Sequence, residues 1–456
     1  MHYRQGDPQY YFDLGNLHKK KGMLDEAVIS YKKSLKINPR SPQVLNNLGN
    51  TLREKGQYDE AIQYYEQALR IEPEYINAYS NIGFTYLEMA QFDRAITCFR
   101  ILLEKYPDYA EAHNALGIAF REIAQFEDAL KSFKRALNLN PDLGEARQNL
   151  SALFLLLGNF QDAWREYRWF WKLRGPYHEL QKPLWDGSDI TGKRLLLHAG
   201  AGFGDTIQFI RYVPFIKERG ASIIIGCQKE IGALLKGVAG IDQVIAEGES
   251  IPPFDIQSSM FRLPIIFETT TDTIPARVPY IAINPQMIGE WRDRINVDNC
   301  RLRIGVIWKG GHGIGMYRYR TCPPEIFSGL SNFNNVAFYS LQIGSNKDEV
   351  NGALKDLNLI DFTGQIKDFL DTAALIESLD LVISIDTAGA HLAGALGKPV
   401  WTLLPHVPDW RWMLEREDSP WYTTMRLFRQ PSPGDWASVI SKVHDELEKI
   451  IAEKTT

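Results

Sequence analysis

Two stretches of the chain place polar residues directly after an apolar run and directly before a helical one. The first, AGAGFGD, ends in Asp205, and the second, DTAGAH, contains Asp386, Thr387 and His391. Backbone N–H groups at the start of a helix can hold an anion, and a hydroxyl and an imidazole beside them add further partners. The second stretch therefore indicates a phosphate-binding site, and the alternative is an ordinary capped helix.

Elements of a parallel sheet surround the second stretch. Residues 381–385 are apolar and rich in β-branched side chains, which predicts a buried strand. Residues 386–389, which include Gly389, form a turn, and a helix of small residues follows as far as Gly397. A second buried strand is expected at 400–404, so the turn lies at the carboxyl edge of a sheet.

The first stretch is similar to a dinucleotide-binding loop but fails the detailed test. Asp205 occupies the position of the third glycine, and the next strand ends in Cys227-Gln228, where an acidic residue would hold a ribose. Gly202 and Gly204 then form a glycine-lined wall of the ligand site. Asp205 is expected to act as a general base that takes a proton from a hydroxyl, or else to cap its helix.

The sequence contains no D-x-D pair, which argues against a metal-bound diphosphate. Without a metal, the charge of a diphosphate would be met by helix N–H groups, Thr387, His391 and a cation. Lys309, Arg318 and Arg320 are the cations on the loop after a predicted strand, and a solvated loop is the alternative for the two arginines. Gln342, at the end of the next strand, is expected to contact the ligand or else to cap the strand.

The segment PDWRW follows the strand 400–404 and offers a cation, Arg411, between two indole rings. A ring in this place could stack on a sugar, but Trp is also common core material. We therefore expect one of Trp410 and Trp412 to be buried and the other to face the ligand site.

Length and composition describe an ordinary globular chain. Its 456 residues are enough for two to four domains, with 45% hydrophobic and 23% charged residues. The net charge of −5 gives no reason to expect nucleic-acid binding. The cysteines are far apart and form no C-x-x-C pair, and the N-terminus lacks the apolar core of a signal peptide, which predicts a cytoplasmic protein. The sequence has no run of about 18 apolar residues, so no membrane span is predicted.

The first third of the sequence repeats with a fixed period. A Leu-Gly or Ile-Gly pair and an aromatic residue recur at the same spacing. The glycines are Gly15, Gly49, Gly83 and Gly117, and the aromatic residues are Tyr31, Tyr65, Phe99 and Phe133. This pattern resembles the tetratricopeptide repeat (TPR) family and predicts an α-solenoid over residues 1–177, with four full repeats and a degenerate fifth.

A TPR array presents a groove to a protein partner, and in this family the residue before the Leu-Gly pair faces the groove. At that position stand Asp13, Asn47, Asn81, Ala115 and Asn149. Asn side chains there can bind a peptide backbone, or else satisfy local helix carbonyls. The fifth repeat is rich in large aromatic residues that are expected to pack on the next domain. They are Trp164, Trp169, Phe170 and Trp171.

Residues 178–193 form a linker with Pro and Gly and without a helical period. Strands and helices then alternate, which predicts two Rossmann-like halves at 194–300 and 301–456, the second closed by a C-terminal helix. Two such halves leave a ligand cleft between their carboxyl edges.

The motifs GFGD and DTAGAHLAGALGKP together resemble the bacterial heptosyltransferases of glycosyltransferase family 9, from residue 194 to the C-terminus. With the TPR array in front, the architecture is also similar to that of O-GlcNAc transferases. The resemblance implies a GT-B fold, with the acceptor on the N-terminal half and a nucleotide sugar on the C-terminal half. It also implies an inverting, metal-independent reaction in which Asp205 is the base.

The same resemblance assigns Asp386, Thr387 and His391 to the donor-phosphate loop and gives Arg320 a contact with the diphosphate. Cys322 stands where the family has Trp, so heptose is not assigned as the sugar. We expect a glycosyltransferase that moves a sugar from a nucleotide-diphosphate donor to a hydroxyl of a protein or glycan acceptor, with no further cofactor. The alternative is a non-catalytic TPR scaffold whose α/β region binds a nucleotide or sugar.

Overall fold

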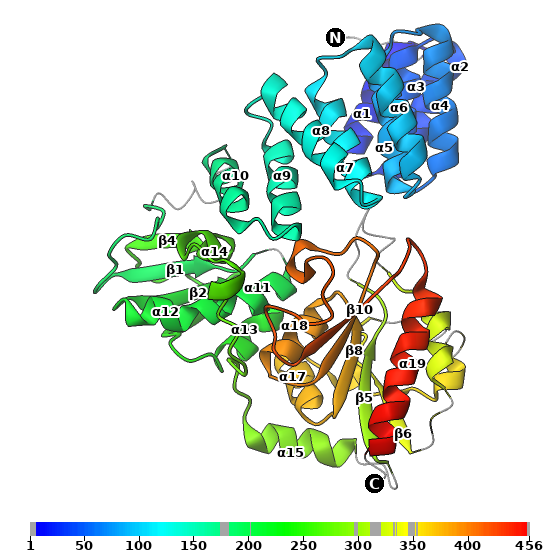
Figure 1. Ribbon diagram of the computed structural model, residues 1–456. Helices are drawn as coiled ribbons and strands as arrows, with labels where there is room; N and C mark the ends of the chain where they lie inside the picture. The colour runs from blue at the N-terminus through cyan, green and yellow to red at the C-terminus, as the bar shows by residue number, and fades with distance from the viewer. Residues whose placement is uncertain are drawn as a thin grey trace. The chain divides into compact units, whose positions relative to one another are not determined.

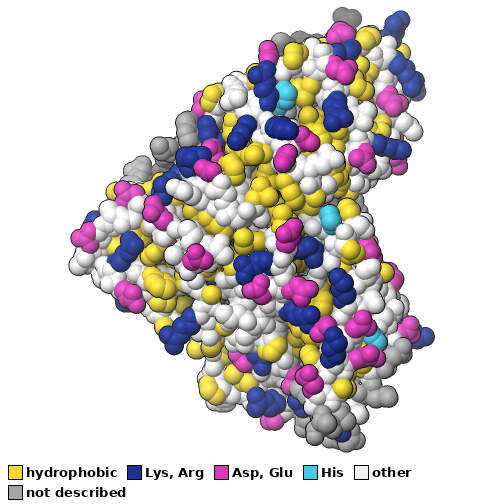
Figure 2. Space-filling view, in the orientation of Figure 1, with side chains coloured by type: hydrophobic (Ala, Val, Ile, Leu, Met, Phe, Trp, Pro, Cys, Tyr) yellow, Lys and Arg dark blue, Asp and Glu magenta, His cyan; other side chains and the backbone are white. Residues whose placement is uncertain are grey.

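The computed structural model describes residues 6–173, 182–200, 202–295, 300–310, 321–331, 333, 335–344, 352 and 354–453 (Figure 1). The chain divides into two compact units between Leu150 and Ser151. The first holds helical repeats, and the second holds two parallel sheets and their helices. On the face shown in Figure 2, basic and acidic side chains are interspersed over the surface, which fits the small net charge.

Four helical hairpins make up the first unit, and each hairpin packs on the next. Their helices are α1 (Pro8–Lys20), α2 (Leu24–Ile37), α3 (Pro42–Glu54), α4 (Tyr58–Ile71), α5 (Ile76–Glu88), α6 (Phe92–Lys105), α7 (Ala110–Glu122) and α8 (Phe126–Leu139). This arrangement confirms the solenoid predicted from the sequence repeat.

A glycine of the first helix and an aromatic ring of the second fix the spacing within each hairpin. A Cβ added to Gly83 would lie 2.7 Å from the ring of Phe99, and one added to Gly49 would lie 2.5 Å from the ring of Tyr65. Both rings are fully buried. Because only glycine admits a ring this close, the Gly and the aromatic residue recur together along the sequence.

The Asn side chains predicted to face the groove bond to asparagines of the preceding repeat. Nδ2 of Asn47 donates to Oδ1 of Asn16 at 3.0 Å, and Nδ2 of Asn81 donates to Oδ1 of Asn46 at 2.8 Å. Nδ2 of Asn149 donates to Oδ1 of Asn114, in the preceding repeat, at 3.0 Å. These amides therefore join successive hairpins rather than satisfy local helix carbonyls, and peptide binding by them stays a prediction.

The second unit starts within α9 (Gly144–Leu156) and continues with α10 (Phe160–Leu173). A four-stranded parallel sheet follows, in the order β3-β2-β1-β4. Its strands are β1 (Arg194–His198), β2 (Ser222–Cys227), β3 (Gln243–Ala246) and β4 (Ile256–Ser259). Its helices are α11 (Phe203–Phe209), α12 (Val213–Glu218), α13 (Lys229–Leu235) and α14 (Leu263–Ile266).

A six-stranded parallel sheet completes the second unit, in the order β10-β9-β8-β5-β6-β7. Its strands are β5 (Leu302–Ile307), β6 (Val336–Ser340), β7 (Ile360–Asp361), β8 (Leu381–Ile385), β9 (Val400–Leu404) and β10 (Met425–Arg429). The accompanying helices are α15 (Pro285–Arg294), α17 (Phe369–Glu377), α18 (Ala388–Ala395) and α19 (Trp436–Glu453). The two sheets confirm the predicted α/β class of this part of the chain.

The C-terminal helix α19 covers one face of the six-stranded sheet (red in Figure 1). Its Val439 and Leu447 share a buried core with Ile383 of β8 and Leu403 of β9. This burial explains the amphipathic pattern of residues 436–453. Among the helices that the structure describes, none combines the length and the apolar composition that crossing a membrane requires.

Candidate functional site

Both sheets have a point at which the strand order reverses, and these points position the candidate site. In the first sheet the chain adds strands on one side of β1 and then places β4 on the other side. In the second sheet the reversal lies between β5 and β8. Ligands of open parallel sheets bind at the carboxyl ends of the strands at such a point. The loops after β1 and β8 are the two stretches singled out in the sequence.

The helices that follow these two loops lie against each other. A Cβ added to Gly204 of α11 would lie 2.9 Å from Cδ2 of His391 and 3.5 Å from Cα of Ala388 on α18. The structure therefore brings the two predicted motifs together. Gly204 acts as a point of close approach between the halves, which explains the need for glycine there.

Asp205 lies in the first turn of α11, and its side chain is mostly buried. The residue that caps this helix is Gly202, so the alternative interpretation of Asp205 as an N-cap is wrong. Gly202 adjoins the carboxylate, since a Cβ there would lie 2.5 Å from Oδ2 of Asp205. Burial raises the pKa of Asp205, and the positive charge of Arg411 opposes this rise.

Arg411 lies in the short helix η9 (Trp410–Trp412) and binds the carboxylate of Asp205 through Nη2. Its Nε donates to Oε1 of Gln208 at 2.5 Å, and its Nη1 donates to Oδ1 of Asp409 at 2.8 Å. Burial works against the charge of Arg411, but Asp409 and Asp205 outweigh it and raise the pKa of the guanidinium. The sequence indicated a cation at this position. It did not indicate that the cation pairs with Asp205 or that Gln208 accepts a bond from it.

The loop after β8 forms as predicted, with Thr387 as the N-cap of α18. Its hydroxyl lies 3.0 Å from Oγ of Ser384 and does not bond to the backbone N–H groups of its own helix. A Cβ on Gly389 would lie 2.1 Å from Cδ1 of Ile307, so the helix approaches β5 closely. Oδ1 of Asp386 lies 3.9 Å from Nε2 of His391.

His391 is almost fully buried inside the second unit. Its Nδ1 lies 2.8 Å from the hydroxyl of Tyr422, and its ring stacks on that of Trp412 with centroids 5.2 Å apart. Burial, with a smaller contribution from Arg411, lowers the pKa of His391 to about 3. Burial therefore favours the neutral imidazole.

This burial predicts a pH dependence of stability. His391 binds a proton in the unfolded chain below about pH 6.5 but stays neutral in the fold down to about 3, so stability falls as the pH drops through this window. Thermal unfolding from about pH 4.5 to 7.5 should show a smaller fall for His391→Gln than for the wild type. His444→Gln, at a partly exposed histidine, is the control. Identical pH slopes for the wild type and His391→Gln would contradict the prediction.

The remaining predicted donor residues are only partly placed. Oε1 of Gln342 accepts a bond from the backbone N of Lys309 at 2.9 Å, which joins the ends of β5 and β6. This contact favours the strand-end role that was the alternative for Gln342. The side chain of Lys309 is exposed beside the same edge. Arg318 and Arg320 lie outside the described residues.

Of the two tryptophans of the PDWRW segment, Trp412 is fully buried, as expected for one of the pair, and Trp410 is half-buried. A contact of Trp410 with a ligand stays a prediction. Trp410 packs edge-to-face on Trp164 of α10, with ring centroids 6.2 Å apart. Trp164 also donates from Nε1 to the carbonyl of Thr269 at 2.6 Å. These contacts confirm that Trp164 packs on the part of the chain that follows the repeats. The side chains of Trp169, Phe170 and Trp171 are not among those that the structure describes.

A cavity of about 340 Å³ opens at the carboxyl ends of β1, β2 and β3. His198, Gln228, Glu247 and Glu249 are its polar lining residues. Nε2 of His198 lies 3.1 Å from Oε1 of Gln257, and burial lowers the pKa of His198. The described lining contains two carboxylates and no Lys or Arg, so it is unsuited to an anion.

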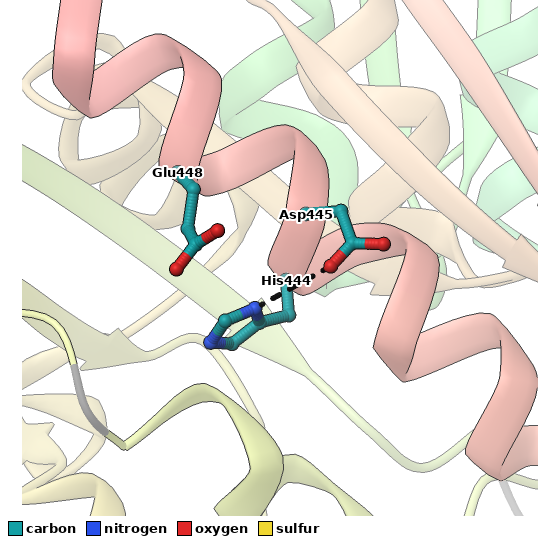
Figure 3. A group of neighbouring side chains, drawn as sticks. All are labelled: His444, Asp445 and Glu448. Carbon is teal, nitrogen blue, oxygen red and sulfur yellow. Dashed lines mark ion pairs between the residues drawn. The ribbon is translucent and has the colours of Figure 1, made fainter.

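A second group of polar side chains lies away from this site, on α19 (Figure 3). The possible ligand atoms of His444, Asp445 and Glu448 lie within 4.8 Å of one another. The two carboxylates are exposed, and the His444 ring lies against Phe333 with centroids 4.7 Å apart. Exposed groups of this kind are common on helix surfaces, so we assign no metal to them.

Comparison with known proteins identifies the class of the first part. Tetratricopeptide repeat families match residues 8–41, 30–63 and 74–142, and a TPR repeat family matches residues 49–89. The N-terminal part of the chain is therefore a TPR array, a class of protein-interaction module.

A curated relative reaches further along the chain. Protein FlbA of Caulobacter vibrioides is 24% identical over 302 residues, which cover 61% of this chain and 50% of FlbA. The matched share of this chain is larger than the TPR array, so it includes part of the α/β region. The chain spans about half the length of this relative.

Solved TPR structures are similar to this chain over a smaller share. TTC0263, a thermophilic TPR protein of Thermus thermophilus, is 23% identical, with a TM-score of 0.34, and the match covers 38% of this chain and 95% of TTC0263. MamA of Desulfovibrio magneticus RS-1 is 20% identical, with a TM-score of 0.33, over 36% of this chain and 94% of MamA.

Proposed function

We propose that the α/β part is a GT-B-type glycosyltransferase that moves a sugar from a nucleotide-diphosphate donor to a hydroxyl acceptor without a metal. One observation carries the proposal. Gly204, the residue before Asp205 at the reversal point of one sheet, lies against the first turn of α18, at the reversal point of the other. A base therefore adjoins a helix N-terminus that can hold a leaving phosphate.

In the proposed reaction the acceptor oxygen attacks the anomeric carbon of the donor sugar. The bond between that carbon and the diphosphate oxygen breaks, and the acceptor proton passes to Asp205. The first N–H groups of α18 and the hydroxyl of Thr387 meet the charge of the leaving diphosphate, with Lys309 and Arg320 as the proposed cations. Neutral His391 supports the loop by its bond to Tyr422.

The proposed acceptor is neutral or cationic, because the cavity beside β1 to β3 carries Glu247 and Glu249. The TPR array would bring a protein acceptor or partner to the enzyme. The second candidate is a non-catalytic scaffold, and the ion pair between Asp205 and Arg411 favours it, since a paired carboxylate is a weaker base.

A thermal-shift screen with UDP, ADP, GDP and CMP tests the donor site. A nucleotide that binds the folded state raises the melting temperature by mass action. Thr387→Ala should reduce this rise for the nucleotide that binds, whereas Thr363→Ala, at a threonine in the short helix η8 (Thr363–Gln365) after the edge strand β7, should leave it unchanged. An unchanged melting temperature with every nucleotide of the panel would contradict the proposed donor site. A shift without sugar transfer would favour the scaffold.

A further inference from the structure

The last helix of the repeat region, α10, is docked on the α/β part by specific contacts. Trp164 is almost fully buried and donates to the carbonyl of Thr269. One turn later, Nη2 of Arg168 lies 3.2 Å from Oε1 of Glu268 and 3.3 Å from the carbonyl of Ile265. The segment 265–269 therefore receives α10 along one face.

From this anchor a chain of contacts leads to the candidate base. Trp164 packs edge-to-face on Trp410, at an interplanar angle of 89°. The guanidinium of Arg411 lies over the ring of Trp410, 4.6 Å from its centroid. Such a cation–π contact is stronger where the cation is shielded from water, and the side chain of Arg411 is only 11% exposed. Arg411 in turn binds Asp205.

Arg411 also holds the face of α11 on which Asp205 lies. Gln208 is one turn after Asp205 on α11, and its Oε1 accepts the bond from Nε of Arg411. One guanidinium thus fixes two side chains of this helix and the preceding Asp409. Planar, forked donor geometry of this kind is specific to arginine, so a lysine could keep the charge but not all three bonds.

We propose that Arg411 is a positioning residue that fixes the carboxylate of Asp205, and that Trp164 of the last repeat helix holds Arg411 in place through Trp410. The proposal rests on the role given to Asp205 in the proposed function. It makes α10 a structural part of the catalytic site as well as the end of the TPR array.

Several charged or titratable groups face Asp205 from the elements around it. Arg411 and Asp409 come from the turn of η9, and Tyr167 comes from α10, where both acidic side chains and Arg411 act on it. His391 and Asp386 lie on the α18 side and interact with Arg411. Of these groups, Arg411 is the cation in contact with the carboxylate. Its removal leaves Asp205 buried beside Asp409 without compensation.

The first experiment compares the pH profile of sugar transfer in Arg411→Gln, Arg411→Lys and the wild type. A cation next to a carboxylate lowers its pKa by about 1–3 units, so the acidic limb should move to higher pH by about this amount in Arg411→Gln. Arg411→Lys should move it less. Trp164→Ala should shift the limb in the same direction, whereas Trp291→Ala, at an equally buried Trp elsewhere in the unit, should not. An unmoved limb in Arg411→Gln would overturn the proposal.

A second readout does not depend on catalysis. Burial raises the pKa of Asp205 in the folded protein, so the protonated carboxyl stabilises the fold. This stabilisation is complete below the pKa of Asp in the unfolded chain and is lost as the pH rises through the pKa of Asp205 in the folded protein. To isolate this loss, the melting temperature of the Asp205→Asn variant is subtracted, at each pH, from that of the same protein with Asp205. The subtraction is made once in the wild type and once in Arg411→Gln. We expect the loss to extend to higher pH in the Arg411→Gln background. Superimposed curves would overturn the positioning role even if no donor is ever found, while failure of the donor screen alone would leave it standing.

Discussion

Asp205→Asn is expected to lower the rate of sugar transfer by about 10²- to 10⁴-fold, the range that general-base catalysis contributes. The amide has almost the shape of the carboxylate, and its oxygen can still accept the bond from Arg411, so the fold around η9 should persist. The amide cannot take the acceptor proton. Steady-state kinetics with a sugar derivative of the nucleotide that binds measures the loss. Calorimetry should show an unchanged affinity for that nucleotide, because the proposed donor site lies on α18.

Asp272→Asn is the control for this substitution. Asp272 is an exposed carboxylate in the same half of the chain, in the short helix η4 (Thr271–Thr273). Its replacement should leave both turnover and donor affinity unchanged. Full turnover in Asp205→Asn would contradict the assignment of the base and would reduce Asp205 to the counter-ion of Arg411.

The fold was predictable where the sequence repeats or alternates. Gly83 and Phe99 recur in register with the other repeats because each hairpin needs the same close contact. The buried strands at 381–385 and 400–404 were visible as apolar runs, and the structure has them as β8 and β9. The helical run after the first glycine stretch is not one helix but α11, a short 3-10 turn and α12. Pro214 explains the break, since proline cannot donate the bond that a continuous helix requires.

The candidate site was predictable only as two separate motifs. The turn chemistry around Thr387 and the glycines before Asp205 are local signals, and the structure places both where the patterns indicated. The ion pair between Asp205 and Arg411 joins residues 206 positions apart, and no local period reports such a contact. The neutral state of His391 also comes from burial by Trp412 and Tyr422, which is a tertiary effect. A close approach such as that of Gly204 to α18 becomes visible only in the folded chain.

Phe99→Ala is expected to destabilise the TPR array by about 3–5 kcal/mol, because it removes a fully buried ring and leaves a cavity. The ring fills the space over Gly83 and packs edge-to-face on Phe84 with centroids 5.5 Å apart. Since each hairpin contacts only its neighbours, the loss should be concentrated in α5, α6 and α7. Hydrogen exchange of the full chain checks this, with amide exchange in α6 at least about 10²-fold faster for a loss of this size.

Ile101→Ala tests whether the loss of stability comes from the buried contact between Phe99 and Gly83 or from any truncation on α6. Ile101 lies on the same helix but is 42% exposed, and surface truncations usually change stability by no more than about 0.5 kcal/mol. Its exchange rates should stay within about threefold of the wild type at this energy. Comparable acceleration in both variants would show that α6 opens independently of the ring over Gly83. Acceleration spread evenly over all eight helices would show that the array unfolds as one unit, and the nearest-neighbour account of its stability would then be wrong.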